Sequence, residues 1–133
     1  MLFDGYRVWY GKTTDIALAY SFLKERMDNK ESIIFVYEKD DTLLGFTQLY
    51  PIFSSVSAER SWLLNDLFVT DQARGQGVGK ELLDYAKAFV IKKGHKGLAL
   101  ETGKTNPAAR LYEREGWILD HEFKHYFWEN KNR

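Results

Sequence analysis

Apolar residues along the chain recur with two different periods, and the change of period separates predicted helices from predicted strands. Steps of three and four residues, typical of one face of a helix, predict helices near residues 2–10, 16–27, 78–90 and 107–115. Runs rich in β-branched and aromatic residues predict a hairpin over residues 32–50 and strands near residues 61–69 and 97–102. The alternating segment at residues 117–129 predicts a final strand or hairpin.

The predicted hairpin turns at residues 39–42, and Pro51 is expected to close its second strand. Residues 61–69 read SWLLNDLFV, so Asn65 and Asp66 interrupt an otherwise apolar strand that we expect to be buried. A buried polar group needs a hydrogen-bonding partner, because leaving it unpaired costs free energy. We therefore expect these two side chains to have partners or a purpose.

Length and composition restrict the kinds of protein that the sequence can encode. A chain of 133 residues fits one domain with a single core. Lys plus Arg equals Asp plus Glu at 19 each, so no net field favours nucleic acid or a membrane surface as a partner. Cysteine is absent, which excludes a disulfide framework and a cysteine nucleophile. Without a secretory leader or a long apolar run, we expect the cytoplasm as location.

Three glycines lie where the strand at residues 61–69 gives way to the helix at residues 78–90, in the segment DQARGQGVGKELL. A strand that enters a helix through glycines leaves backbone N–H groups unpaired at the positive end of the helix dipole. Gly75 and Gly77 let the backbone approach an anion, and Gly79 permits close packing of the helix. The alternation favours a phosphate-binding loop over a tight turn without a ligand, since one glycine usually suffices for a turn.

Two common phosphate-binding motifs do not fit this segment at their fixed spacings. A P-loop needs a glycine five residues before the Gly-Lys pair and Ser or Thr after it, but Arg74 and Glu81 hold these positions. A dinucleotide fingerprint needs a glycine three residues after Gly77, where Lys80 stands. The sequence therefore supports neither a nucleotide hydrolase nor a dehydrogenase.

The segment RGQGVG at residues 74–79 resembles the Arg/Gln-x-x-Gly-x-Gly/Ala signature of the GNAT superfamily of N-acetyltransferases. LNDLFV resembles the family's strand ahead of that loop, and NPAARLYEREGW resembles its Asn-x-x-Ala-x-x-x-Tyr-Glu-x-x-Gly-Phe/Trp segment. GFTQLYPIFSS is similar to a subgroup of small bacterial members. The resemblance implies an α/β (α+β) fold with a mixed, mostly antiparallel sheet flanked by helices, in a single domain over residues 1–133. Family members usually begin with a further strand, so either that strand is dispensable here or the sequence is truncated.

The resemblance also implies an enzyme that moves an acetyl group from acetyl-CoA directly to a primary amine of a small molecule or to a lysine side chain. The absence of cysteine agrees with direct transfer, because no thiol is available for an acyl-enzyme. One alternative stays open, a non-catalytic acetyl-CoA-binding sensor or regulatory module. A third reading is a structural interaction domain whose glycine loop binds nothing.

By the same resemblance, acetyl-CoA binds at Leu67, Phe68, Val69, Arg74, Gly75, Gln76, Gly77, Val78, Gly79, Lys80, Asn106 and Tyr112. One backbone N–H among residues 67–69 polarises the acetyl carbonyl. Tyr112 is the expected general acid to the CoA sulfur, and a packing role in the core is its alternative. Asn106 contacts the pantetheine arm or an ordered water, unless it only caps its helix.

The general base is expected among the carboxylates of two predicted buried strands. Several family members carry a glutamate at the position of Asn65, but an amide cannot accept the proton. Asp66 and Glu101 remain, since burial raises the pKa of a carboxyl group toward useful values. Either residue can equally be a structural hydrogen-bond acceptor, and a water chain to bulk solvent is the remaining possibility.

Other residues suggest features of the acceptor side and of assembly. An aromatic wall for an amine, or simply part of the core, is predicted from Tyr6, Trp9, Tyr10, Tyr50 and Phe53. His95, His121 and His125 lack a metal-ligand pattern, so we expect no metal. The strand near residues 33–37 begins the sheet with an unpaired edge, which residues 117–129 of a second copy are suited to cover. The sequence thus predicts a homodimer.

Overall fold

The computed structural model describes residues 1–133 and divides them into two compact units, Met1–Glu101 and Thr102–Arg133. The first unit contains helices α1 (Leu2–Trp9), α2 (Ile16–Asp28) and α3 (Val78–Lys93), a 3-10 turn η1 (Asp71–Ala73), and strands β1 (Ile33–Lys39), β2 (Thr42–Ser54), β3 (Glu59–Val69) and β4 (Leu98–Ala99). The second unit contains helix α4 (Ala108–Arg114). None of these helices combines the length and the apolar character needed to cross a bilayer.

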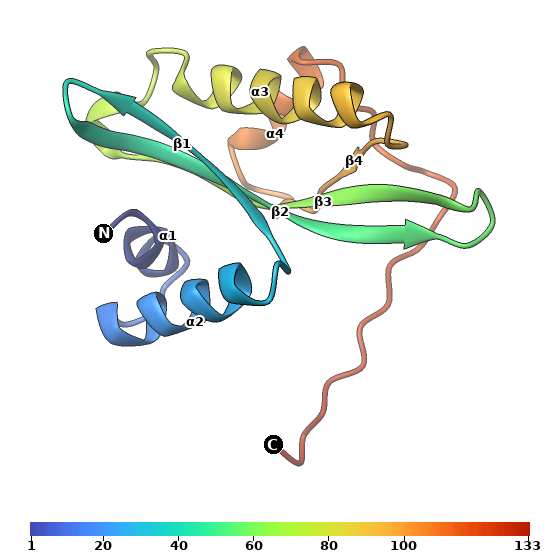
Figure 1. Cartoon of the computed structure of the whole chain (residues 1–133), viewed down its shortest axis with the longest axis horizontal. Helices are drawn as coiled ribbons and strands as arrows, with labels where there is room; N and C mark the ends of the chain where they lie inside the picture. Colours follow the sequence, from blue (N-terminus) through green and yellow to red (C-terminus); the bar gives the residue numbers. More distant parts are fainter. The chain divides into compact units, whose positions relative to one another are not determined.

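The four strands form one sheet in the order β1-β2-β3-β4. The first two pairings are antiparallel, and β4 runs parallel to β3. Helices α1 and α2 cover one face of the sheet, and α3 covers the other (Figure 1). The mixed, mostly antiparallel sheet flanked by helices is therefore confirmed, as are the helices predicted within this unit.

The hairpin turn lies at the predicted place, between β1 and β2. Asp40 and Asp41 both adopt positive φ angles there, 51° and 60°, as a tight hairpin turn requires. The expectation that Pro51 closes the second strand is wrong, since β2 continues to Ser54. The pairing of β1 with β2 ends at Leu49, so β2 has no partner on that side at Pro51. A proline there costs no ladder hydrogen bond.

Strand β3 contains a bulge that reverses the direction of its side chains. Gln48 of β2 pairs with Asp66, while the next residue along β2 pairs with Leu64, so Asn65 is the extra residue. Before the bulge, Trp62 packs its ring against Phe89 of α3. After the bulge, Phe68 packs on the opposite face among the rings of α1 and β2. The bulge therefore turns Asp66 toward the face that α1 and α2 cover.

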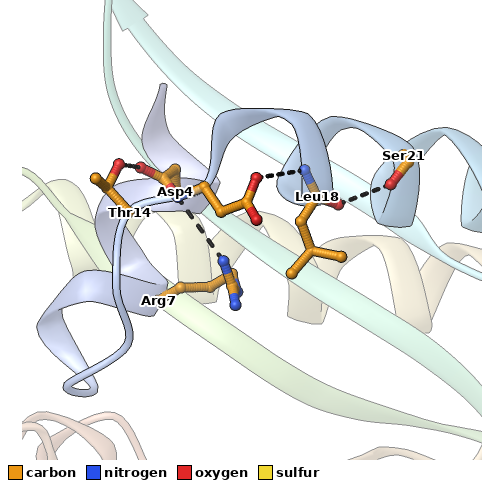
Figure 2. Close-up of polar contacts among 6 residues, drawn as sticks. Asp4, Arg7, Thr14, Leu18 and Ser21 are labelled. Carbon is orange, nitrogen blue, oxygen red and sulfur yellow. Dashed lines mark hydrogen bonds and ion pairs between the residues drawn. The ribbon is translucent and has the colours of Figure 1, made fainter.

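Helix α1 is tied to the start of α2 by the buried side chain of Asp4. Its carboxylate accepts hydrogen bonds from the Thr14 hydroxyl at 2.5 Å and the Asp15 backbone N–H at 2.8 Å, and Figure 2 shows Arg7 on its other side. These donors hold the pKa of Asp4 below its usual value. Asp15 caps the start of α2, since its side chain accepts the Leu18 N–H at 3.0 Å.

The second unit differs from the sequence prediction after its helix. No strand follows α4, so the final strand or hairpin predicted at residues 117–129 is absent. Most apolar side chains of this segment are exposed, including Ile118, Phe123, Phe127 and Trp128. An alternating sequence becomes a strand only where a neighbouring edge accepts its backbone hydrogen bonds, and this segment pairs with none.

Candidate active site

The glycine loop between η1 and α3 adopts a backbone conformation that few other residues tolerate. Gly75 and Gly77 have φ angles of 76° and 81°, and Gly77 is the residue that caps α3. A residue with a Cβ pays about 1–2 kcal/mol in this left-handed region. A Cβ added at either glycine would meet nothing within 4 Å, so packing does not demand these glycines. The loop backbone is open to an approaching ligand.

Backbone N–H groups gather at this loop without backbone partners. The first hydrogen bond of α3 runs from the Glu81 N–H to the Gly77 carbonyl at 3.0 Å, so the N–H groups of Val78 and Gly79 precede it. No turn or cap hydrogen bond uses the N–H of Gly75, Gln76 or Gly77. Unpaired donors at the positive end of a 16-residue helix suit a diphosphate.

The polar side chains of the loop mostly form hydrogen bonds and ion pairs with neighbouring residues of the chain. Arg74 donates from Nε to the Val69 carbonyl at 3.1 Å, and its Nη1 lies 2.7 Å from the Asp71 carboxylate. Gln76 donates to the Gln72 carbonyl at 3.0 Å. On the helix, Lys80 forms an exposed ion pair with Asp84, and the Val78 side chain is buried. Binding of an anion therefore falls chiefly to the backbone.

Strand β3 presents an open backbone edge next to this loop. Strand β4 pairs only with Trp62 and Leu63, whereas β2 pairs with β3 along its whole length. On the side of β4, the backbone from residue 64 to residue 69 therefore lies outside the ladder. This edge includes Leu67, Phe68 and Val69, whose side chains pack on the sheet faces.

Asp66 is buried, with an exposed fraction of 2%, and both of its carboxylate oxygens accept hydrogen bonds. Gln48 donates from Nε2 to Oδ2 at 2.5 Å, and Asn65 donates from Nδ2 to Oδ1 at 2.9 Å. The two polar residues that interrupt β3 thus have partners. Burial, together with the Asp66 charge, raises the pKa of Tyr6 above its usual value and that of Tyr50 to about 12. Both phenols are neutral hydrogen-bond donors near pH 7.

The second candidate base lies in a different setting. The prediction of a buried strand is wrong for Glu101, because β4 ends at Ala99 and the Glu101 side chain is exposed. Only two residues of this segment pair with β3, so the strand is too short to enclose the glutamate. The argument from burial applies to Asp66 alone.

Of the five aromatic residues named from the sequence, Tyr6, Trp9 and Tyr10 lie together at α1, and Tyr50 lies beside Asp66. The Tyr6 and Tyr10 rings are 5.0 Å apart, and Trp9 contacts Tyr10 at 4.8 Å. The charge of Asp66 is one of the causes of the raised pKa of Tyr50. Phe53 is separate, since it lies near the end of β2 under the Arg60 guanidinium.

The remaining site residues belong to the unit Thr102–Arg133. Tyr112 is a buried residue of α4, and its ring lies 5.9 Å from that of Trp117. The Asn106 side-chain oxygen accepts the Ala108 N–H at 2.9 Å, which is a helix-capping contact. The roles assigned to these two residues in catalysis and donor binding stay predictions. No group of three His, Cys, Asp or Glu side chains in the chain is arranged to hold a metal ion.

Sequence reasoning missed Gln48, which is completely buried beside Asp66. Its Oε1 atom has no hydrogen-bonding partner. The available signal was a glutamine inside the apolar run GFTQLY, the same kind of interruption that drew attention to Asn65 and Asp66. The register that places Gln48 opposite Asp66 depends on the bulge, which the residue pattern does not reveal.

Comparison with known proteins extends these observations to a family. Residues 2–117 match the model of the acetyltransferase (GNAT) family. An uncharacterized N-acetyltransferase of Bacillus subtilis, YhfO, is 47% identical over 126 residues, which cover 94% of this chain and 85% of that protein. A protein of Haemophilus influenzae described as a probable acetyltransferase is 31% identical over 125 residues, covering 84% of this chain and 86% of that protein.

A solved structure shares the fold closely. The crystal structure of a probable acetyltransferase superposes with a TM-score of 0.92 at 38% identity, covering 98% of this chain and 89% of that one. The family match spans most of the chain, and it includes the glycine loop and α4. The chain is an acetyltransferase and belongs to the GNAT family.

Proposed function

We propose that this acetyltransferase uses acetyl-CoA as its donor and moves the acetyl group directly to a primary amine, either of a small molecule or of a lysine side chain. The observation that carries the proposal is the loop at residues 74–79, whose left-handed glycines leave backbone donors exposed at the start of α3. Acetyl-CoA is the donor typical of the family, and its diphosphate fits such a loop. The non-catalytic alternative is not favoured, since the relatives are named as acetyltransferases.

The donor site in this proposal contains the loop and the open edge of β3, and Asn106 and Tyr112 keep the roles that the resemblance to the family implies. The backbone of residues 75–79 holds the diphosphate, and Lys80 adds charge at the helix start. The backbone of Leu67, Phe68 and Val69 lies along the pantetheine arm, where an N–H polarises the acetyl carbonyl.

The reaction needs one bond made, one bond broken and two proton transfers. The amine nitrogen attacks the thioester carbon, so that a C–N bond forms and the C–S bond breaks. Tyr112 donates its phenolic proton to the leaving sulfur and regains a proton from solvent. Asp66 accepts the proton that the amine loses. We prefer Asp66 to Glu101 because Asp66 is buried on the face of α1 and the aromatic rings, whereas Glu101 is exposed.

The test is release of the CoA thiol from acetyl-CoA in the presence of a panel of primary amines and lysine peptides. Because the chain contains no cysteine, a thiol-reactive dye reports only the product. We expect amine-dependent release with at least one member of the panel, and mass spectrometry should find the acetylated amine. Acetyl-CoA binding without transfer to any amine would instead support a sensor.

A further inference from the structure

The guanidinium of Arg74 has only part of its hydrogen-bonding capacity left for a phosphate. Its Nε donates to the Val69 carbonyl at 3.1 Å, and its Nη1 lies 2.7 Å from the Asp71 carboxylate. A guanidinium contacts a phosphate most strongly through two neighbouring nitrogens, either Nε with Nη2 or Nη1 with Nη2. Each of these two edges has one nitrogen already engaged. A two-bond contact with a diphosphate therefore requires that Arg74 lose one of its present partners.

Asp71 is the partner that an anion can displace. The Val69 carbonyl belongs to the backbone of β3, whereas the Asp71 carboxylate is on an exposed side chain, with an exposed fraction of 87%. An exposed ion pair is weak, because water and salt screen the charges and both side chains lose freedom when they pair. A carboxylate and a diphosphate are both anions that accept hydrogen bonds from Nη1, so they compete for the same donor.

The pair also holds the positive charge of Arg74 on the side of α1. The guanidinium carbon lies 5.9 Å from the centre of the Phe68 ring, which packs on the sheet face that α1 and α2 cover. Asp71 and Arg74 line a pocket there together with Leu2 and Gly5 of α1. The unpaired N–H groups of the loop begin α3 instead, which covers the other face of the sheet (Figure 1). Asp71 thus directs the charge toward α1 rather than toward the start of α3.

We propose that Asp71 is a positioning residue that competes with the diphosphate of the donor for Arg74 and so limits the affinity of the loop for acetyl-CoA, an inference that rests on the proposed function. CoA carries the same diphosphate as acetyl-CoA, so the competition weakens binding of substrate and product by the same factor. A residue that changes the binding of all states equally acts on KM and not on the chemical step. Weaker binding of CoA also favours its release after each turnover.

The first experiment is a double-mutant cycle measured by calorimetric titration with acetyl-CoA and with CoA. Asp71→Asn keeps the size of the side chain and removes its charge, so that Nη1 of Arg74 becomes available. We expect Asp71→Asn to bind both ligands about threefold more tightly than wild type, a modest gain because the pair is exposed. In the Arg74→Ala background the same substitution should change neither affinity, because Asp71 acts through Arg74. A gain of equal size in that background, or no gain in Asp71→Asn alone, would overturn the inference.

Two further variants separate the ion pair from other effects of the substitution. Asp71→Glu keeps the carboxylate and should retain the affinity of wild type within about twofold. Asp28→Asn removes the same charge from an exposed ion pair of α2 with Lys24, and it should leave the affinity unchanged. Tighter binding in either variant would show that the loop responds to the shape of the side chain or to net charge, and this result would contradict the role of Asp71.

Titration does not require acetyl transfer, so this inference and the proposed function fail separately. The expected cycle, in a protein that transfers acetyl to no amine of the panel, would support the role of Asp71 and contradict the transferase chemistry. Amine-dependent transfer together with a cycle that shows no coupling between Asp71 and Arg74 would support the chemistry and overturn the role of Asp71.

Discussion

At the scale of single residues, the structure changes how the arginine of the loop is understood. Arg74 donates to the Val69 carbonyl and pairs with Asp71, so its charge is already engaged. We expect Arg74→Ala to weaken acetyl-CoA binding by no more than about fivefold, because an exposed ion pair contributes roughly 1 kcal/mol or less. Calorimetric titration checks this. A loss comparable to that of a loop glycine would show that the side chain, and not the backbone, holds the diphosphate.

A second residue-scale prediction concerns Tyr112. If its phenol protonates the leaving sulfur, Tyr112→Phe should lower kcat by about 100-fold or more with little change in acetyl-CoA affinity. Tyr126→Phe is the matched control, since Tyr126 is exposed in the same unit and should leave both quantities unchanged. Equal losses of kcat and affinity in Tyr112→Phe would identify a packing residue, consistent with its contact to Trp117.

At the scale of elements, Asp4 joins α1 to the start of α2 and so positions Tyr6 on the sheet face. Its pKa lies below the usual value, chiefly because the Thr14 hydroxyl donates to the ionised form. A depressed folded-state pKa means that its contribution is present above the unfolded-state pKa and is lost as the pH falls through the folded-state value.

Asp4→Ala should therefore lower the urea midpoint of unfolding at pH 7, and the difference from wild type should shrink at about pH 3. Asp28→Ala is the control, since Asp28 is an exposed partner in a surface ion pair of α2. A difference that persists undiminished at low pH would show that Asp4 acts through packing rather than through its charge.

The elements themselves show which parts of the fold can be predicted from residue patterns. The helices and the hairpin turn could be predicted, because they depend on interactions between residues close together in the sequence. Examples are the Asp15 cap of α2 and the Asp40-Asp41 turn. The bulge at Asn65 was not predicted, because it depends on how two strands pair and leaves no local sequence mark. Of the candidate site, the loop was predictable from its glycines, whereas the Gln48–Asp66 contact follows from the bulged register.

At the scale of the whole molecule, two features support the predicted homodimer. Strand β1 lies at the end of the sheet, so its outer edge has unpaired backbone groups. Residues 117–129 form no strand and expose Phe123, Phe127 and Trp128. We expect light scattering to find twice the chain mass of 15.6 kDa at tens of micromolar protein. A monomer at that concentration would contradict this assembly.

The central claim is that the backbone of the glycine loop holds acetyl-CoA, and one set of titrations tests it most directly. Gly77→Asp places a Cβ and a carboxylate at the start of α3, while Gly94→Asp places them in a similar left-handed position at the other end of the helix. Calorimetry should find that wild type and Gly94→Asp bind acetyl-CoA alike, and that Gly77→Asp loses at least about 100-fold in affinity through charge repulsion. A folded Gly77→Asp protein that binds acetyl-CoA as tightly as wild type would contradict the account.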